Sequence, residues 1–312
     1  MKKILFPIIL LLAFLAQPAF AGPSVVVLQS SRLLPYEQAR QGLDKVLADH
    51  PPSSGAKSIQ AADTSLFVLS EETEPQFLKS LIEAKHPQLV VAIGGKALAF
   101  AASLATDKPI VYLLVPDAKQ ILKGRRNVTG VEMTIPPARQ LEGLAAVLPR
   151  AKRIGVIYDP EKTSGLVAEA RDAAAKLGMA LVVEKTSSSK EVPDLLARLR
   201  GRIDAFWLLP DLTVVTPQTL EKILLFSVME KIPVLSFSEK HLEAGAAVAV
   251  TFDLPAMGEK AGELAWDVLQ GGKACKVSAV LPDKVKIEIN RTVLQKLGSD
   301  YRPERAVGEA RP

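Results

Sequence analysis

Short apolar runs alternate with segments of helical period along most of the chain. Apolar strands are predicted at 24–28, 66–69, 89–93, 110–115, 153–158, 180–184, 204–209, 233–237, 246–250 and 285–289. Between them, spaced apolar residues and capping residues predict helices over 36–48, 73–82, 96–104, 165–177, 192–199, 216–230, 253–269 and 291–297. Such alternation, with strands apolar at every position, is typical of parallel sheets covered by helices on both faces.

The two halves of this pattern resemble each other. The strand at 89–93 is followed by Gly94-Gly95, a helix and a strand that begins after Lys108-Pro109. The run at 203–209 is followed by Pro210-Asp211, a helix and a strand that begins near Pro233. A length of 312 residues, 48% of them apolar, also suits two domains better than one core. We therefore predict two α/β lobes of the same construction.

The N-terminus has the parts of a secretory signal peptide. Lys2 and Lys3 precede an uncharged apolar run at 4–16, and Ala19-Phe20-Ala21 provides a small-residue cleavage site. The run is too short to span a bilayer comfortably. The single cysteine, Cys275, lies far from the cleavage site and has no disulfide partner. We expect cleavage after Ala21 and a soluble periplasmic protein without a lipid anchor.

The charge does not indicate a nucleic-acid partner. The formal net charge is +5, and about +3 once Lys2 and Lys3 leave with the signal peptide. One short basic cluster, Lys123, Arg125 and Arg126, is typical of a solvated loop and less often of an anion site.

Signatures of enzymes and cofactor sites are largely absent. The sequence has no GxSxG elbow, no GxGxxG and no GxxxxGK[ST]. Its three histidines, His50, His86 and His241, do not have metal-ligand spacing. We therefore expect no enzyme activity, no cofactor and no metal.

Three loops stand where open parallel sheets bind ligands, beyond the carboxyl ends of strands. Gly94-Gly95-Lys96 opens a helix, whose free N–H groups and Lys96 suit a carboxylate. Asp211, in the equivalent loop of the second half, suits an ammonium group, and Ser236-Phe237-Ser238 offers hydroxyls and a ring. Structural alternatives stay open: a simple turn at Gly94-Gly95, a turn or helix cap at Asp211, and an N-cap at Ser238.

Several segments, in order and spacing, resemble one known family. They are Val25 to Gln29 with Pro35 to Leu43, Leu89 to Ala97, Asn127-Val128-Thr129-Gly130-Val131, Leu148 to Pro160, Lys231 to Val234, and Ile287 to Asn290. The chain resembles the ABC-transporter substrate-binding family whose characterised members bind aromatic amino acids, a branch of the type I periplasmic binding proteins.

The resemblance implies two Rossmann-like lobes with parallel sheets, joined by a three-segment hinge near Thr129 to Ile135, Val248 to Asp253 and Ala274 to Asp283. Residues 22–130 with 252–273 would form the first lobe and residues 131–251 with 274–298 the second. The segment 299–312 is charged and contains Pro and Gly, so we expect a disordered tail there. The resemblance also implies a monomer that binds a small molecule by hinge closure and docks on an ABC permease in the inner membrane.

The same resemblance implies a set of ligand contacts. They are Gly94, Gly95, Pro116, Asp117, Tyr158, Asp211, Thr213, Ser236, Phe237 and Ser238. Lys96 is a further candidate contact, because its charge next to Gly95 suits a carboxylate. The first pocket loop departs from the Thr or Ser and Pro common in the family, and Ser236 to Ser238 replaces a loop that is commonly acidic. An amino acid or a related carboxylate is therefore one possible class of ligand.

Two other functions remain open. The fold could carry a degenerate pocket and serve as a periplasmic sensor or interaction protein, or it could be a secreted α/β enzyme. Neighbouring genes for a permease and an ATPase would favour transport.

Overall fold

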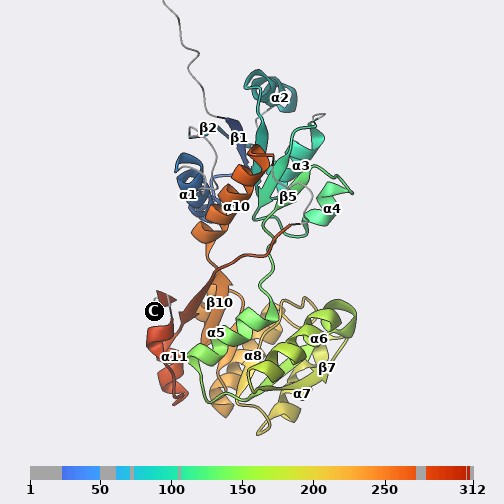
Figure 1. Ribbon diagram of the computed structural model, residues 1–312. Coiled ribbons are helices and arrows are strands. Elements are labelled where there is room, and N and C mark those ends of the chain that lie inside the picture. Colours follow the sequence, from blue (N-terminus) through green and yellow to red (C-terminus); the bar gives the residue numbers. More distant parts are fainter. Residues whose placement is uncertain are drawn as a thin grey trace, which may run out of the picture.

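The computed structural model describes residues 23–49, 61–70, 74–104, 107–271, 279–306 and 308–309. These residues form two α/β lobes, each built around its own sheet, with a narrow connection between them (Figure 1). The predicted signal peptide, Thr73 and Cys275 lie outside the described residues.

Lobe 1 contains a parallel sheet in the order β2-β1-β3-β4-β5. Its strands are β1 (Ser24–Gln29), β2 (Asp63–Val68), β3 (Leu89–Ile93), β4 (Ile110–Leu113) and β5 (Val128–Gly130). Helices α1 (Leu34–Ala48) and α10 (Leu254–Leu269) pack on one face. Helices α2 (Pro75–Ala84), α3 (Gly95–Ser103) and α4 (Ala118–Leu122) pack on the other.

Lobe 2 contains a sheet in the order β12-β11-β10-β9-β8-β6-β7, in which only the β10–β11 pair is antiparallel. Its strands are β6 (Arg153–Tyr158), β7 (Ala180–Lys185), β8 (Ala205–Trp207), β9 (Val234–Ser236), β10 (Val248–Phe252), β11 (Val285–Ile289) and β12 (Gly308–Glu309). Helices α5 (Pro137–Val147), α6 (Pro160–Lys176) and α11 (Arg291–Lys296) pack on one face. Helices α7 (Val192–Leu199), α8 (Pro217–Glu230) and α9 (Glu239–Ala244) pack on the other, and a short 3₁₀ turn (Ser189–Glu191) precedes α7.

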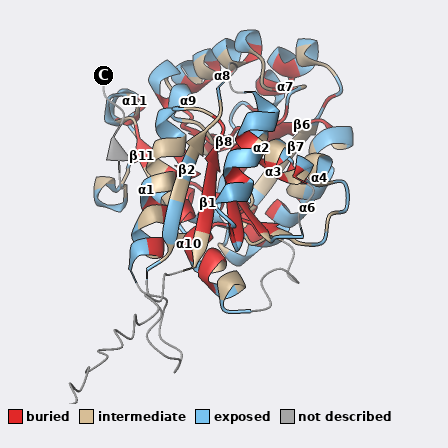
Figure 2. Cartoon of the chain, turned by 90° about the horizontal axis from the view of Figure 1, so that it is seen from above, coloured by how far each residue is buried: buried red, intermediate tan, exposed pale blue. Residues whose placement is uncertain are grey.

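The central strands are buried because helices cover both faces of each sheet. Every residue of β3, β4, β8 and β9 is buried. Seen from above, the buried strands labelled β1 and β8 lie in the middle of the molecule, with exposed helix surfaces around them (Figure 2). This is the reason why alternation of apolar and polar residues is absent from them, as the sequence led us to expect.

Helices α1 and α10, far apart in the sequence, cross at very short distance in lobe 1 (Figure 1). A Cβ atom built on Gly258 would lie 1.8 Å from the carbonyl oxygen of Ala39, and one on Gly42 would lie 2.0 Å from that of Pro255. The absence of side chains at these positions therefore permits the contact that brings α10 into lobe 1.

The described elements pass between the lobes three times. The first crossover leads from β5 to α5, the second is Asp253 between β10 and α10, and the third leads from Val280 to β11. The first and third run side by side, because Val131 and Val280 form a parallel bridge and Glu132 N–H donates to the Val280 carbonyl at 2.8 Å. Three connecting segments were predicted, near these positions.

The structure corrects several details of the prediction, and α4, α5 and β5 were not predicted. Helix α6 begins at Pro160 and not at Gly165, since the Asp159 carboxylate caps it by accepting the Glu161 N–H, and Thr163 interrupts its regular geometry. The tail beyond Ser299 is not without structure. It contains the 3₁₀ turn Pro303–Arg305 and β12, which pairs with β11.

Candidate functional site

The carboxyl edges of the two sheets face each other. The chain leaves lobe 1 from the carboxyl end of β5 and leaves lobe 2 from the carboxyl end of β10. Since the neighbouring strands β1–β4 and β6–β9 run parallel to these, their carboxyl ends also point toward the opposite lobe (Figure 1). The loops predicted to bind ligand follow these strands, so the fold brings them to one region between the lobes.

In lobe 1, Gly94 stands at the N-terminus of α3 in a conformation that favours glycine, with φ of 88°. A Cβ atom there would lie 2.6 Å from Ser30 Oγ and 2.8 Å from Tyr36 Cζ. Ser30 Oγ in turn accepts the Ala97 N–H at 2.9 Å. Ser30 and Tyr36, which the sequence did not single out as contacts, thus pack directly against the predicted Gly94 turn. Gly95 is partly exposed, and Lys96 is exposed.

Pro116 and Asp117 form the exposed turn between β4 and α4. Asp117 has left-handed backbone geometry, with φ of 47°, and its carboxylate accepts a hydrogen bond from the Gln120 side chain. Helix α4 packs beside α3, so this turn and the Gly94 turn belong to one surface of lobe 1.

In lobe 2, the carboxylate of Asp211 is enclosed by partners of its own lobe, with 1% of the residue exposed. Its Oδ2 accepts the Asp159 N–H at 2.8 Å and the Thr163 hydroxyl at 2.7 Å. Its Oδ1 accepts the backbone N–H groups of Thr213 and Val214. The structural alternative, a turn cap, therefore describes Asp211 in this conformation.

Thr213 joins the same network through the neighbouring loop. Its hydroxyl donates to Asp159 Oδ2 at 2.7 Å. This bond and the bond from the Glu161 N–H hold the pKa of Asp159 below its ordinary value. The carboxylates of Asp159 and Asp211 thus fix the loops after β6 and β8 to each other.

Tyr158, the last residue of β6, is mostly buried. Only 6% of the residue is exposed, and it belongs to the core of lobe 2 that α5 and α6 cover. In this structure its side chain packs mainly against that core.

Ser236, Phe237 and Ser238 surround His241 of α9. Ser236 Oγ lies 2.6 Å from His241 Nδ1 and accepts the Ser238 N–H at 3.2 Å. The Phe237 ring meets the imidazole edge-on, with ring centroids 5.1 Å apart. Burial lowers the pKa of His241. Ser238 occupies the N-cap position of α9, but its side chain makes no capping bond.

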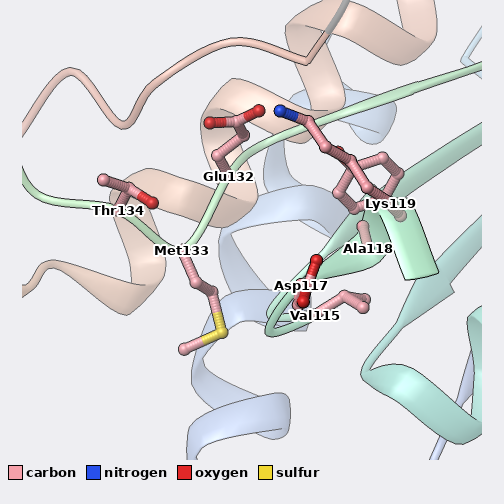
Figure 3. A pocket seen from close by; sticks show the side chains of 8 residues that line it. Val115, Asp117, Ala118, Lys119, Glu132, Met133 and Thr134 are labelled. Atoms are coloured by element: carbon pink, nitrogen blue, oxygen red, sulfur yellow. The ribbon is translucent and has the colours of Figure 1, made fainter. Parts of the chain in front are cut away.

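A pocket of about 310 Å³ lies where the Asp117 turn meets the first crossover (Figure 3). It is lined by Tyr112, Val115, Asp117, Ala118, Lys119, Glu132, Met133 and Thr134. The ammonium group of Lys119, from α4, and the carboxylate of Glu132, from the crossover, point toward each other (Figure 3). The sequence predicted Asp117 and the crossover separately, but a pocket between them depends on tertiary structure.

The described residues contain neither a cluster that could bind a metal ion nor a helix that could span a membrane. No group of three or more histidine, cysteine or acidic side chains there is arranged to hold a metal ion. No helix in the described ranges has the length and apolar character needed to cross a bilayer.

Comparison with known proteins identifies the family. The family model described as ABC transporter substrate binding protein matches residues 35–310. The chain belongs to this family. Among curated proteins, it is similar to a tyrosine-binding protein of Clostridioides difficile (strain R20291), with 28% identity over 238 residues, which cover 72% of this chain and 68% of that protein.

Solved structures of similar fold include substrate-binding proteins. The ligand-free, open structure of a substrate-binding protein with adhesive properties from Clostridium difficile gives a TM-score of 0.69 at 22% identity, covering 92% of this chain and 98% of that chain. A domain from Streptococcus pneumonia in complex with L-Trp gives a TM-score of 0.52 at 22% identity, covering 93% and 100%. The predicted type I periplasmic binding protein fold, with two α/β lobes, is therefore confirmed.

Proposed function

We propose that this protein binds an amino acid or a related small carboxylate outside the cytoplasm and delivers it to an ABC importer. The family is one of substrate-binding proteins and not of enzymes. Relatives described as tyrosine-binding or solved with L-Trp favour an amino acid as ligand. The proposed partners are the small ligand and a permease in the inner membrane, with no nucleic acid, and the proposed state in solution is a monomer.

The observation that carries the proposal is the position of the α3 N-terminus. The Gly94-Gly95 turn exposes the beginning of a nine-residue helix at the carboxyl edge of the lobe 1 sheet. Helix N-termini favour anions through unpaired N–H groups and the helix dipole. A Cβ atom built on Gly95 would have a single neighbour within 4 Å, Ile121 Cδ1 at 3.8 Å, so a ligand carboxylate can approach the backbone there.

Lobe 2 would complete the site when the lobes close. We propose that Thr213, Phe237 and Ser238 contact the ligand directly, since each is partly exposed at the carboxyl edge of its sheet. Asp211 and Ser236 would act through other residues, because their side chains are buried and hydrogen-bonded within the lobe. A ligand that touches both lobes favours the closed form by its higher affinity for that form.

A thermal-shift screen of residues 22–312 tests this function. L-amino acids, small carboxylates and nucleosides would be screened separately, after mass spectrometry of a denatured sample has shown it to be free of ligand. We expect a reproducible rise in melting temperature with amino acids or carboxylates, since 100 times the Kd stabilises the native state by about 2.7 kcal/mol. A folded, ligand-free sample that responds to none of them would contradict the proposal.

A further inference from the structure

A zwitterionic ligand would need a carboxylate for its ammonium group. Placing an ammonium group in a closed cleft is costly without an anionic hydrogen-bond acceptor. Asp211, the residue that the sequence suggests for this task, already accepts four hydrogen bonds. A second carboxylate is therefore needed for the ammonium group.

Most other carboxylates on the facing edges are also engaged. Asp159 accepts from Thr213, Asp253 from the Ala256 N–H, and Asp117 from Gln120. Glu191 accepts from Thr186, and Glu239 pairs with Lys286 at 3.2 Å. Each of these carboxylates therefore has at least one oxygen engaged within the protein.

Glu132 differs from them. Its backbone is fixed by the bond from its N–H to the Val280 carbonyl, and its side chain lies in the pocket beside the first crossover (Figure 3). Within the described part of the chain, its carboxylate forms no ion pair and accepts no hydrogen bond. Its negative charge adds to the burial that raises the pKa of Tyr112, which lines the same pocket.

The charges around Glu132 suit a zwitterion. Lys119 faces it from α4 and likewise has no ion-pair partner in the described ranges. Helix α4 packs beside the N-terminal end of α3, since Ile121 is the neighbour of Gly95. Lys119 and the α3 dipole therefore bring positive charge, and Glu132 negative charge, to the same pocket.

We infer that Glu132 binds the ammonium group of the ligand and thereby selects amino acids over the corresponding acids without an amino group. This inference rests on the proposed function and names the residue that distinguishes the two classes of ligand. Because Glu132 lies in the first crossover, next to the Val131–Val280 bridge, the bound ammonium group also contacts the hinge itself.

The test compares matched ligands that differ only in the amino group. The probes are L-tyrosine, L-tryptophan and L-leucine against 3-(4-hydroxyphenyl)propionate, 3-indolepropionate and 4-methylpentanoate, measured by titration calorimetry on residues 22–312. We expect wild type to prefer an amino acid over its partner, and Glu132→Gln to weaken amino-acid binding roughly 10- to 100-fold while leaving the deaminated partner nearly unchanged.

Two carboxylate variants serve as comparisons. Glu169→Gln removes an exposed charge on the outer face of α6 and should leave both affinities unchanged. Glu161, exposed at the start of α6, lines a second pocket, so Glu161→Gln tests a rival partner. The melting temperature of ligand-free Glu132→Gln, equal to that of wild type, shows that the variant is folded.

The outcomes separate the two claims. If wild type binds none of the six probes and no other amino acid or carboxylate, the proposed function itself fails. If wild type binds amino acids and their deaminated partners equally, or Glu132→Gln keeps the preference, the function stands and the inference is overturned. A loss of preference in Glu161→Gln alone would assign the role to that residue instead.

Discussion

The backbone N–H of Asp159 donates to Asp211 Oδ2 at 2.8 Å and joins the loop after β6 to the loop after β8. Three more donors, the Thr163 hydroxyl and the N–H groups of Thr213 and Val214, surround the same buried carboxylate. The loop surface that lobe 2 presents to lobe 1 therefore depends on one side chain that is buried within that lobe.

Replacing Asp211 should destabilise the protein more than a direct ligand contact would. Asp211→Ala leaves four donors without their acceptor, and we expect a loss of about 3 kcal/mol or more in the free energy of unfolding. Urea unfolding of the ligand-free protein measures it. Asp172→Ala, at an exposed position of α6, should change stability by less than about 0.5 kcal/mol. Normal stability of Asp211→Ala with loss of ligand affinity would instead favour the direct contact with an ammonium group.

The Gly94 turn gives a second prediction. Gly94→Ala places a Cβ atom 2.6 Å from Ser30 Oγ at a φ of 88°, so we expect a lower melting temperature and weaker ligand binding. The positive φ alone costs roughly 1–2 kcal/mol. Gly95→Ala places its Cβ at an ordinary contact distance from Ile121 and should melt near wild type. Equal melting temperatures of the two variants, measured by calorimetry, would contradict the role of the turn geometry.

The crossing of α1 and α10 gives a third prediction. Gly258→Ala forces a Cβ atom against the Ala39 carbonyl, and we expect a loss of more than about 2 kcal/mol. Gly165→Ala, where a Cβ atom meets nothing within 4 Å on an exposed position of α6, should stabilise by roughly 0.5–1 kcal/mol. The melting temperature should therefore fall below that of wild type in Gly258→Ala and rise above it in Gly165→Ala. A shift of both melting temperatures in the same direction would contradict the close contact between α1 and α10.

His241 predicts a pH dependence of stability. Burial lowers its pKa in the folded protein below the ordinary value of 6.5, so the folded state disfavours the proton that the unfolded state binds. Stability from this group is complete above pH 6.5 and falls as the pH decreases from there toward the folded-state pKa. Wild type should lose more stability between pH 8 and pH 5 than His241→Asn, which does not titrate. Parallel pH profiles of the two proteins in urea unfolding would show that His241 is not the cause.

The sequence predicted elements well where apolar runs end at strong signals. The limits of β3, β6, α7 and β11 were predicted to the residue, and α8 begins after its Thr216 cap as expected. The start of α6 was missed because the helix was predicted to begin at Gly165, although Asp159 followed by Pro160 is a helix-initiating pair. The local sequence pattern predicts the limits of an element only where it is compatible with a single type of secondary structure.

The candidate site was less predictable than the fold. Position after a strand correctly brought the Gly94, Asp211 and Ser236 loops to the facing edges. It does not reveal whether a side chain points outward or is consumed by internal partners, as Asp211 is. Lys119 and Glu132 line one pocket only because the fold brings α4 and the first crossover to it, and nothing in the spacing of these residues along the chain indicates that arrangement.

Closure of the lobes around the ligand is the central claim, and small-angle X-ray scattering tests it directly. Residues 22–312 would be measured alone and with a saturating concentration of the ligand that gives the largest thermal shift. We expect a smaller radius of gyration with ligand than without it, because a ligand held by both lobes favours the closed form. A radius of gyration that stays the same while calorimetry shows the ligand bound would contradict a site formed between the lobes.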